Sequence, residues 1–111
     1  MSAAMIRKTL AAAAFLALAL PASAASGDAE AGQKKSAPCK ACHGEAGVSV
    51  SDAFPNLAGQ HGDYLAAALR HYKNGKRKNP IMQGQVASLS EKDVLDLAAF
   101  YSHQKGLVVK H

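Results

Sequence analysis

Two cysteines and a histidine stand close together in the segment CKACH, which runs from Cys39 to His43 and holds both cysteines of the chain. Cys39 and Cys42 are three residues apart, so on a helical turn both sulfur atoms would face the same side. His43 follows directly and could turn its ring toward whatever the sulfurs hold. Residues of these types at this spacing occur in redox dithiols, zinc sites, disulfides and covalent cofactor attachments.

Three of these chemistries fit the rest of the sequence poorly. A thioredoxin-like dithiol needs a strand–helix–strand setting, and no stretch of this chain alternates as a strand would. A structural zinc site needs four nitrogen or sulfur ligands, whereas this cluster supplies only three. A disulfide between residues so close in sequence closes a very small loop, which limits its stabilising effect.

The fourth chemistry is the attachment of haem c. In C-x-x-C-H the two thiols form thioethers with the haem vinyl groups, and the histidine ligates the iron. The pattern therefore predicts one covalently attached haem c, held by Cys39 and Cys42, with His43 as an iron ligand. A disulfide or a redox dithiol remains the alternative.

The group on the opposite face of the iron decides what such a haem can do. An open face would bind gases or activate peroxide, whereas a second strong protein ligand would restrict the site to electron transfer. Met82 is the only methionine beyond the first few residues, and it lies in NPIMQG, a segment predicted as a loop restricted by Pro80 and Gly84. We expect Met82 to be this second ligand, with core filling as the alternative role.

Four histidines are rival ligands to Met82, and His61, in a glycine-flanked turn, is the best of them. The others lie beside or near the end of predicted helices, or at the end of the chain: His71, His103 and His111. A His/Met pair predicts a six-coordinate, low-spin haem of relatively high reduction potential, because the thioether and an apolar shell both favour ferrous iron.

The elements that must position these residues are predicted to be helices joined by loops marked with Gly and Pro. A short helix is expected from about Asp28 to Ser36, ending before Pro38. A second is expected from about Asp63 to Asn74, with Gly75 in the left-handed conformation at its end. Its apolar positions recur at helical spacing: Tyr64, Leu65, Ala68, Leu69 and Tyr72.

The last predicted helix begins after Ser90, which with Asp93 can form a capping box. It is expected to reach Gly106 and to present one apolar face, made of Val94, Leu97, Ala98 and Tyr101. Three modest helices bury little apolar surface by themselves. A large, rigid apolar group such as a haem would complete the core.

The N-terminal segment predicts export. Arg7 and Lys8 precede an apolar run from Leu10 to Leu20, followed by Pro21 and small residues, which is the layout of a secretory signal peptide. A membrane-spanning helix needs about 20 apolar residues, so an uncleaved membrane anchor is the weaker alternative for this run. We expect residues 1–24 to be cleaved, leaving residues 25–111 as a single periplasmic domain.

The net charge of the chain and its distribution indicate which kind of partner it binds. The formal net charge is +5, and the leader contributes two of these charges. A nucleic-acid-binding protein typically has a dense basic stripe with stacking aromatics, whereas this chain has no Trp and three Tyr, so nucleic acid is not expected. One basic cluster is present, made of Lys73, Lys76, Arg77 and Lys78. Two roles are open for it: a solvated helix end whose cations complement the helix dipole, or, in addition, Arg77 pairing a haem propionate and the other cations steering an acidic redox partner.

Four segments occur in a familiar order: CKACHG, FPNLAGQHGDYL, YKNGKRKNPIM and ASLSEKDVLDLAAFYS. Together they make the chain resemble a small soluble bacterial class I cytochrome c. The resemblance implies an all-α fold of three main helices and loops wrapped around one haem, with His43 and Met82 as axial ligands. It also suggests that the carbonyl of Pro55 accepts the second ring N–H of His43, with a simple turn at Pro55 as the alternative.

The predicted function is electron transfer rather than catalysis. No nucleophile with a paired base, carboxylate couple or phosphate-binding loop is evident. We expect a periplasmic carrier that takes one electron from a quinol-oxidising cytochrome bc complex or a similar donor to a terminal oxidase or reductase. The alternatives are a haem subunit of a larger redox enzyme and a ligand-binding or peroxidatic haem protein.

Overall fold

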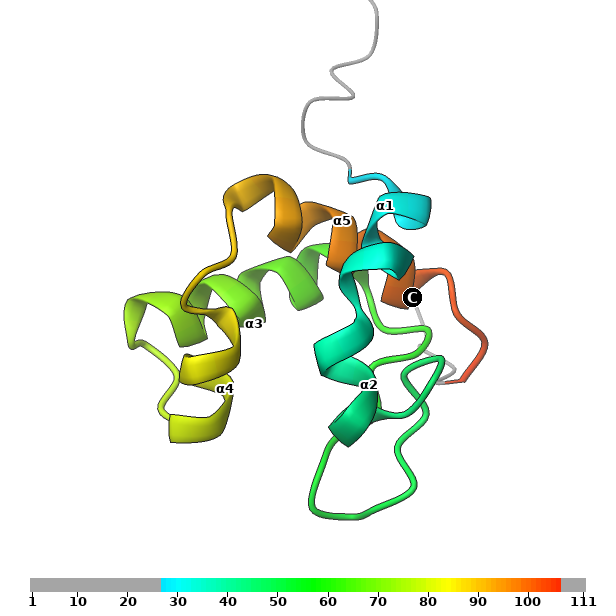
Figure 1. Cartoon of the computed structure of the whole chain (residues 1–111), viewed down its shortest axis with the longest axis horizontal. Helices are drawn as coiled ribbons and strands as arrows, with labels where there is room; N and C mark the ends of the chain where they lie inside the picture. Colours follow the sequence, from blue (N-terminus) through cyan, green and yellow to red (C-terminus); the bar gives the residue numbers. More distant parts are fainter. Residues whose placement is uncertain (1–26, 107–111) are drawn as a thin grey trace, which may run out of the picture.

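The computed structural model describes residues 27–106, and within that range it contains helices and no β-strand. The predicted signal peptide and His111 lie outside the described residues. The helices, in chain order, are α1 (Ala29–Lys35), α2 (Ala37–His43), α3 (Gly62–Asn74), α4 (Pro80–Val86) and α5 (Glu91–Ser102) (Figure 1). No helix between residues 27 and 106 is long and apolar enough to cross a membrane.

The three predicted helices are present as α1, α3 and α5. Asp28 caps α1 by accepting the backbone N–H groups of Glu30 and Ala31. Gly75 ends α3 with φ +82° and ψ +4°, the left-handed conformation that glycine adopts at no steric cost. The capping box of Ser90 and Asp93 is formed at the start of α5. The predicted C-terminal end of this helix is wrong, because α5 ends at Ser102 rather than continuing to Gly106.

The structure adds two short helices, and each has in its first turn a proline that was expected to end a helix or to restrict a loop. Pro38 lies in the first turn of α2, and Pro80 is the first residue of α4. Proline is tolerated there because the first N–H groups of a helix have no partner inside the helix. The prediction that Met82 lies in a loop is therefore corrected: Met82 is in the first turn of α4.

The core forms where α3 and α5 pack together over the loop that follows α2. Leu65 and Ala66 of α3 meet a larger set of buried residues on α5, namely Val94, Leu97, Ala98, Phe100 and Tyr101. The loop is tied to this core by backbone hydrogen bonds from Leu57 N to Gly47 O (2.7 Å) and from Gly59 N to Tyr101 O (3.0 Å). These bonds place the loop segment around Pro55 beside α2.

Candidate functional site

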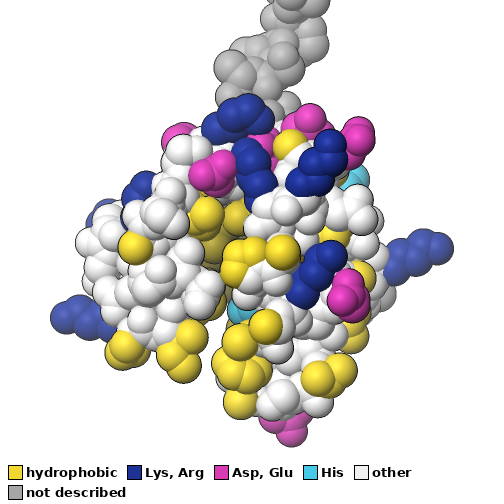
Figure 2. All heavy atoms as spheres, viewed as in Figure 1, with side chains coloured by type: hydrophobic (Ala, Val, Ile, Leu, Met, Phe, Trp, Pro, Cys, Tyr) yellow, Lys and Arg dark blue, Asp and Glu magenta, His cyan; other side chains and the backbone are white. Residues whose placement is uncertain are grey.

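A cavity of about 310 Å³ lies between α2, α3, α4, α5 and the loop after α2. Its volume falls at the lower end of the range of about 300–1,000 Å³ that is usual for small-molecule and cofactor sites. Figure 2 shows the cleft between the part of the molecule formed by α3 and α4 and the part formed by α2 and its loop. Hydrophobic side chains lie on both sides of this cleft, so its walls favour an apolar group.

Both cysteines lie on one wall of the cavity, on α2. Cys39 and Cys42 are half-buried, and they are not joined in a disulfide. Burial raises the pKa of the Cys39 thiol above its usual value, because a thiolate is disfavoured away from water. The helical turn that carries them gives both thiols access to one ligand from the same side.

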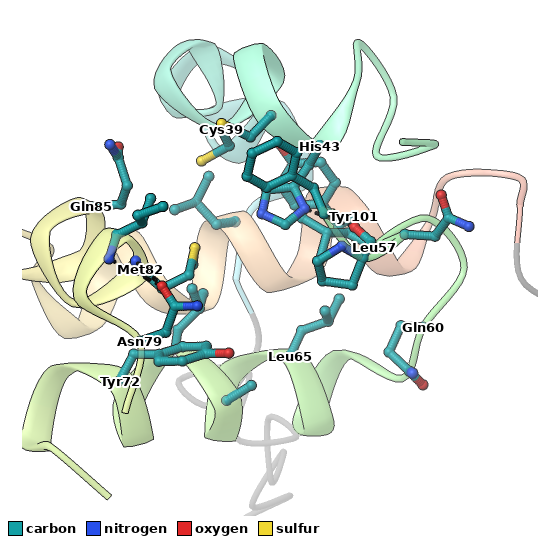
Figure 3. A pocket seen from close by; sticks show the side chains of 18 of the residues that line it. Cys39, His43, Leu57, Gln60, Leu65, Tyr72, Asn79, Met82, Gln85 and Tyr101 are labelled. Carbon is teal, nitrogen blue, oxygen red and sulfur yellow. Dashed lines mark hydrogen bonds between the residues drawn. The ribbon is translucent and has the colours of Figure 1, made fainter. Parts of the chain in front are cut away.

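His43 ends α2 with its ring buried in the cavity wall, where 5% of the residue is exposed. Its Nδ1 lies 2.8 Å from the carbonyl oxygen of Pro55. A carbonyl oxygen only accepts hydrogen bonds, so Nδ1 carries a hydrogen and Nε2 is the nitrogen left for a ligand. That second nitrogen is directed into the cavity (Figure 3). Phe54 packs edge-on against the ring, with centroids 6.3 Å apart, and limits its rotation.

Met82 is half-buried and lines the same cavity, reaching it from α4. Its side chain and the ring of His43 point toward each other across the cavity (Figure 3). The rival histidines of the described residues lie elsewhere. His61 precedes α3, His71 is on that helix, and His103 is exposed with its Nδ1 2.6 Å from Ala99 O; none of them lines the cavity.

The four cations of the basic cluster differ in their positions relative to the cavity. Arg77 reaches the cavity, where its guanidinium lies over the ring of Tyr72, 4.8 Å from the centroid, and its Nη1 is 3.5 Å from the hydroxyl of Tyr64. Lys73 donates to the carbonyl oxygen of Leu89. Lys76 and Lys78 are exposed. Arg77 is thus the cation placed to meet an anionic group at the cavity.

Sequence reasoning missed three side chains that line this cavity. Tyr64 and Tyr72 were taken as part of a core face, but they face the cavity beside Arg77. Asn79 was taken as a loop residue, although it caps α4. The signal for Asn79 was present, because Asn directly before Pro is a common start of a helix.

The side chains fit a covalently bound haem. Two thiols on one wall, an imidazole nitrogen and a thioether sulfur facing each other, and one cation meet in a mainly apolar space. The hydroxyl of Tyr101 is buried beside Cys39 and Ser36 without a hydrogen bond of ordinary geometry to any described residue. Burial raises the pKa of this phenol. It is a polar group in the wall that the described residues alone do not satisfy.

Residues 29–105 match the family described as cytochrome c. The chain is 47% identical over 81 residues to cytochrome c4 of Pseudomonas aeruginosa, which covers 73% of this chain and 40% of that protein. It is 40% identical over 82 residues to cytochrome c-554(548) of Halomonas halodenitrificans, covering 71% of this chain and 99% of that protein. It is 42% identical over 103 residues to the thiosulfate dehydrogenase electron acceptor of Thiomonas intermedia, and this match covers 90% of this chain and 45% of that protein.

The fold is similar to a solved structure as well. Reduced recombinant cytochrome c4 from Pseudomonas stutzeri superposes with a TM-score of 0.71 at 46% identity, over 75% of this chain and 48% of that one. The match therefore spans no more than half the length of the cytochromes c4, but nearly the whole length of cytochrome c-554(548).

Proposed function

This chain belongs to the cytochrome c family as a small class I cytochrome c with haem c as its cofactor, and from that premise we propose that His43 and Met82 are the axial ligands of a single haem iron. When bound, haem c supplies an iron that carries one electron by alternating between its ferrous and ferric forms. The observation that supports this proposal is that His43 and Met82 face each other across the cavity whose wall holds Cys39 and Cys42.

His43 would act as a preorganised nitrogen ligand. The hydrogen bond from Nδ1 to Pro55 O fixes the tautomer, and the buried ring has little freedom to turn. Such a partner on the second nitrogen orients a metal-ligating histidine and raises its basicity.

Met82 would close the other face of the iron. A thioether is a soft ligand that favours the ferrous form, and an apolar wall disfavours the additional positive charge of the ferric form. Both effects raise the reduction potential. A site closed on both faces passes electrons without binding a substrate at the iron.

The proposed setting is the periplasm. Residues 1–24 would be removed as a signal peptide, leaving residues 25–111 as one domain. A quinol-oxidising cytochrome bc complex or similar donor would reduce it, and a terminal oxidase or reductase would accept the electron. A sulfur-oxidising dehydrogenase is a second candidate donor, because two relatives are named thiosulfate dehydrogenase electron acceptor, from Thiomonas intermedia and Stutzerimonas stutzeri.

Replacement of the methionine tests the ligand assignment. In the oxidised wild-type protein we expect the charge-transfer band of an iron–sulfur bond, and in the reduced protein no binding of carbon monoxide. Met82→Ala should remove the band and allow carbon monoxide to bind at full occupancy. His103→Ala, which alters an exposed histidine away from the cavity, is the control and should keep both properties. A wild-type protein that binds carbon monoxide readily would instead support the ligand-binding or peroxidatic function.

The exposed cations Lys76 and Lys78 are proposed to steer an acidic partner to the cavity mouth, beside Arg77. With an acidic redox partner, the bimolecular rate of electron transfer should fall as ionic strength rises, because salt screens long-range attraction. Neutralising both residues, as Lys76→Gln with Lys78→Gln, should lower the rate at low salt by on the order of tenfold. Lys105→Gln, beyond the end of α5, should have little effect. A rate that does not respond to salt would refute electrostatic docking.

A further inference from the structure

One residue satisfies the backbone donors in the first turn of α4. The side-chain Oδ1 of Asn79 accepts the N–H groups of Ile81 (3.0 Å) and Met82 (3.1 Å). The carbonyl oxygen of Asn79 accepts the N–H of Gln83 at 2.8 Å. Pro80 has no N–H to satisfy. Every backbone donor from the start of α4 to Gln83 therefore depends on Asn79.

Packing does little to hold this helix. Of its residues only Val86 is buried, while Pro80, Ile81, Gly84 and Gln85 are exposed. A Cβ built on Gly84 would have no atom within 4 Å. A helix of this length is unstable by itself in water, because few hydrogen bonds offset the cost of nucleation. The cap is therefore a large part of what keeps α4 helical.

The segment before α4 is shaped to start the helix at Pro80. Asn79 is extended, with φ −152° and ψ +114°, as expected for a residue before proline. Proline then fixes the backbone for the first helical position. Met82 is the third residue of α4, so this geometry directs its side chain into the cavity (Figure 3). Fraying of the first turn would move the Cα of Met82 and release its side chain.

We propose that Asn79 is a positioning residue, whose side chain holds the first turn of α4 so that the sulfur of Met82 stays directed at the iron. This inference rests on the proposed function, in which Met82 is an axial ligand. Asn79 acts through the backbone amide of Met82 and does not itself bind the iron. It would set how readily another ligand displaces the methionine.

The test is an equilibrium titration of the oxidised haem protein with imidazole, followed by loss of the iron–sulfur charge-transfer band. Loss of an N-cap typically corresponds to about a fivefold change in an equilibrium constant, so Asn79→Ala should bind imidazole about fivefold more tightly. Asn79→Ser keeps a capping oxygen and should stay close to wild type. Ser90→Ala is the matched control, because it removes the cap of α5, a helix whose start lies away from the cavity.

The outcomes separate this inference from the proposed function. Asn79→Ala and Ser90→Ala should both unfold at lower temperature, but only Asn79→Ala should bind imidazole more tightly. Unchanged imidazole binding in Asn79→Ala, or an equal change in Ser90→Ala, would overturn the positioning role while leaving Met82 as a ligand. A wild-type protein without the charge-transfer band would overturn the proposed ligand, and the positioning role with it.

Discussion

Asp96 is a buried carboxylate on α5 whose partners come from two helices. It accepts the backbone N–H of Asp28 at 2.8 Å and pairs with the ammonium groups of Lys35 (2.6 Å) and Lys92 (2.7 Å). These bonds hold the pKa of Asp96 well below its usual range, and the bond from the backbone N–H of Asp28 has the largest effect. Lys35 also bonds Asp93 and, with the cap at Ser90, lowers the pKa of that carboxyl to about 2. The network ties both ends of α1 to α5.

Acid should weaken this network. A carboxylate with a depressed folded pKa stabilises the protein fully above its unfolded value, about 3.9, and the stabilisation is lost as pH falls through the folded pKa. Asp96→Asn should lower the free energy of unfolding at pH 7 by about 2 kcal/mol. It should also lose less stability than the wild-type protein when the pH falls below the pKa that Asp96 has in the unfolded chain. Urea unfolding at a series of pH values measures both effects.

The control for that experiment is Glu91→Gln, which removes an exposed partner of Arg70. Exposed ion pairs contribute little, so its unfolding should stay close to wild type. An Asp96→Asn protein with the wild-type slope of stability against pH would show that Asp96 does not carry the acid sensitivity.

At the residue scale, residue type and spacing predicted most of the candidate haem site. Cys39, Cys42 and His43 were predicted from a five-residue motif because their chemistry is local. Met82 was predicted because it is the only methionine after Met5, and it lines the cavity. The position of Tyr64 and Tyr72 in the cavity wall could not be predicted. Helical spacing marks an apolar face but does not show whether protein or a cofactor covers it.

The contact between α1 and α5 depends on a glycine. A Cβ placed on Gly32 would lie 1.9 Å from the carbonyl oxygen of Asp96 and 2.8 Å from Cβ of Phe100. Only a residue without a side chain lets the two helices approach this closely. This contact joins the two ends of the described chain, and it supports the helix that carries Tyr101 in the cavity wall.

Gly32→Ala should therefore push the helices apart and lower the free energy of unfolding by about 3 kcal/mol, the upper end of the usual cost of overpacking. Gly84→Ala is the matched control, since the same change in α4 meets open space. It should leave stability unchanged or raise it by up to about 1 kcal/mol. Chemical denaturation of both variants measures the difference. Equal effects of the two substitutions would show that close approach at Gly32 is not required.

At the element scale, the sequence predicted α1, α3 and α5 and did not predict α2 and α4. The start of α5 and the end of α3 carry caps that act through neighbouring residues, so the sequence alone identified them. The short helices α2 and α4 offer little periodicity, and their prolines were taken as breaks. Met82 was accordingly expected in a loop, although Asn79 and Pro80 together start a helix there.

At the scale of the whole molecule, the cavity belongs to no single element. Three helices besides α2 contribute walls, and a chain of this size has a small core in which a central apolar space is costly. A haem bonded to Cys39 and Cys42 would fill that space and serve as part of the core. Attachment and folding are therefore expected to depend on each other, a relationship that local sequence patterns do not reveal.

The central claim is that the sulfur of Met82 lies opposite His43 on a single haem iron, and proton NMR of the ferrous protein tests it most directly. Met82 is the only methionine within residues 27–106. A methyl group held over the porphyrin face is shifted far upfield by the ring current. We predict one such three-proton resonance, which disappears in Met82→Leu. A spectrum without this resonance, or one in which it persists in Met82→Leu, would contradict the account.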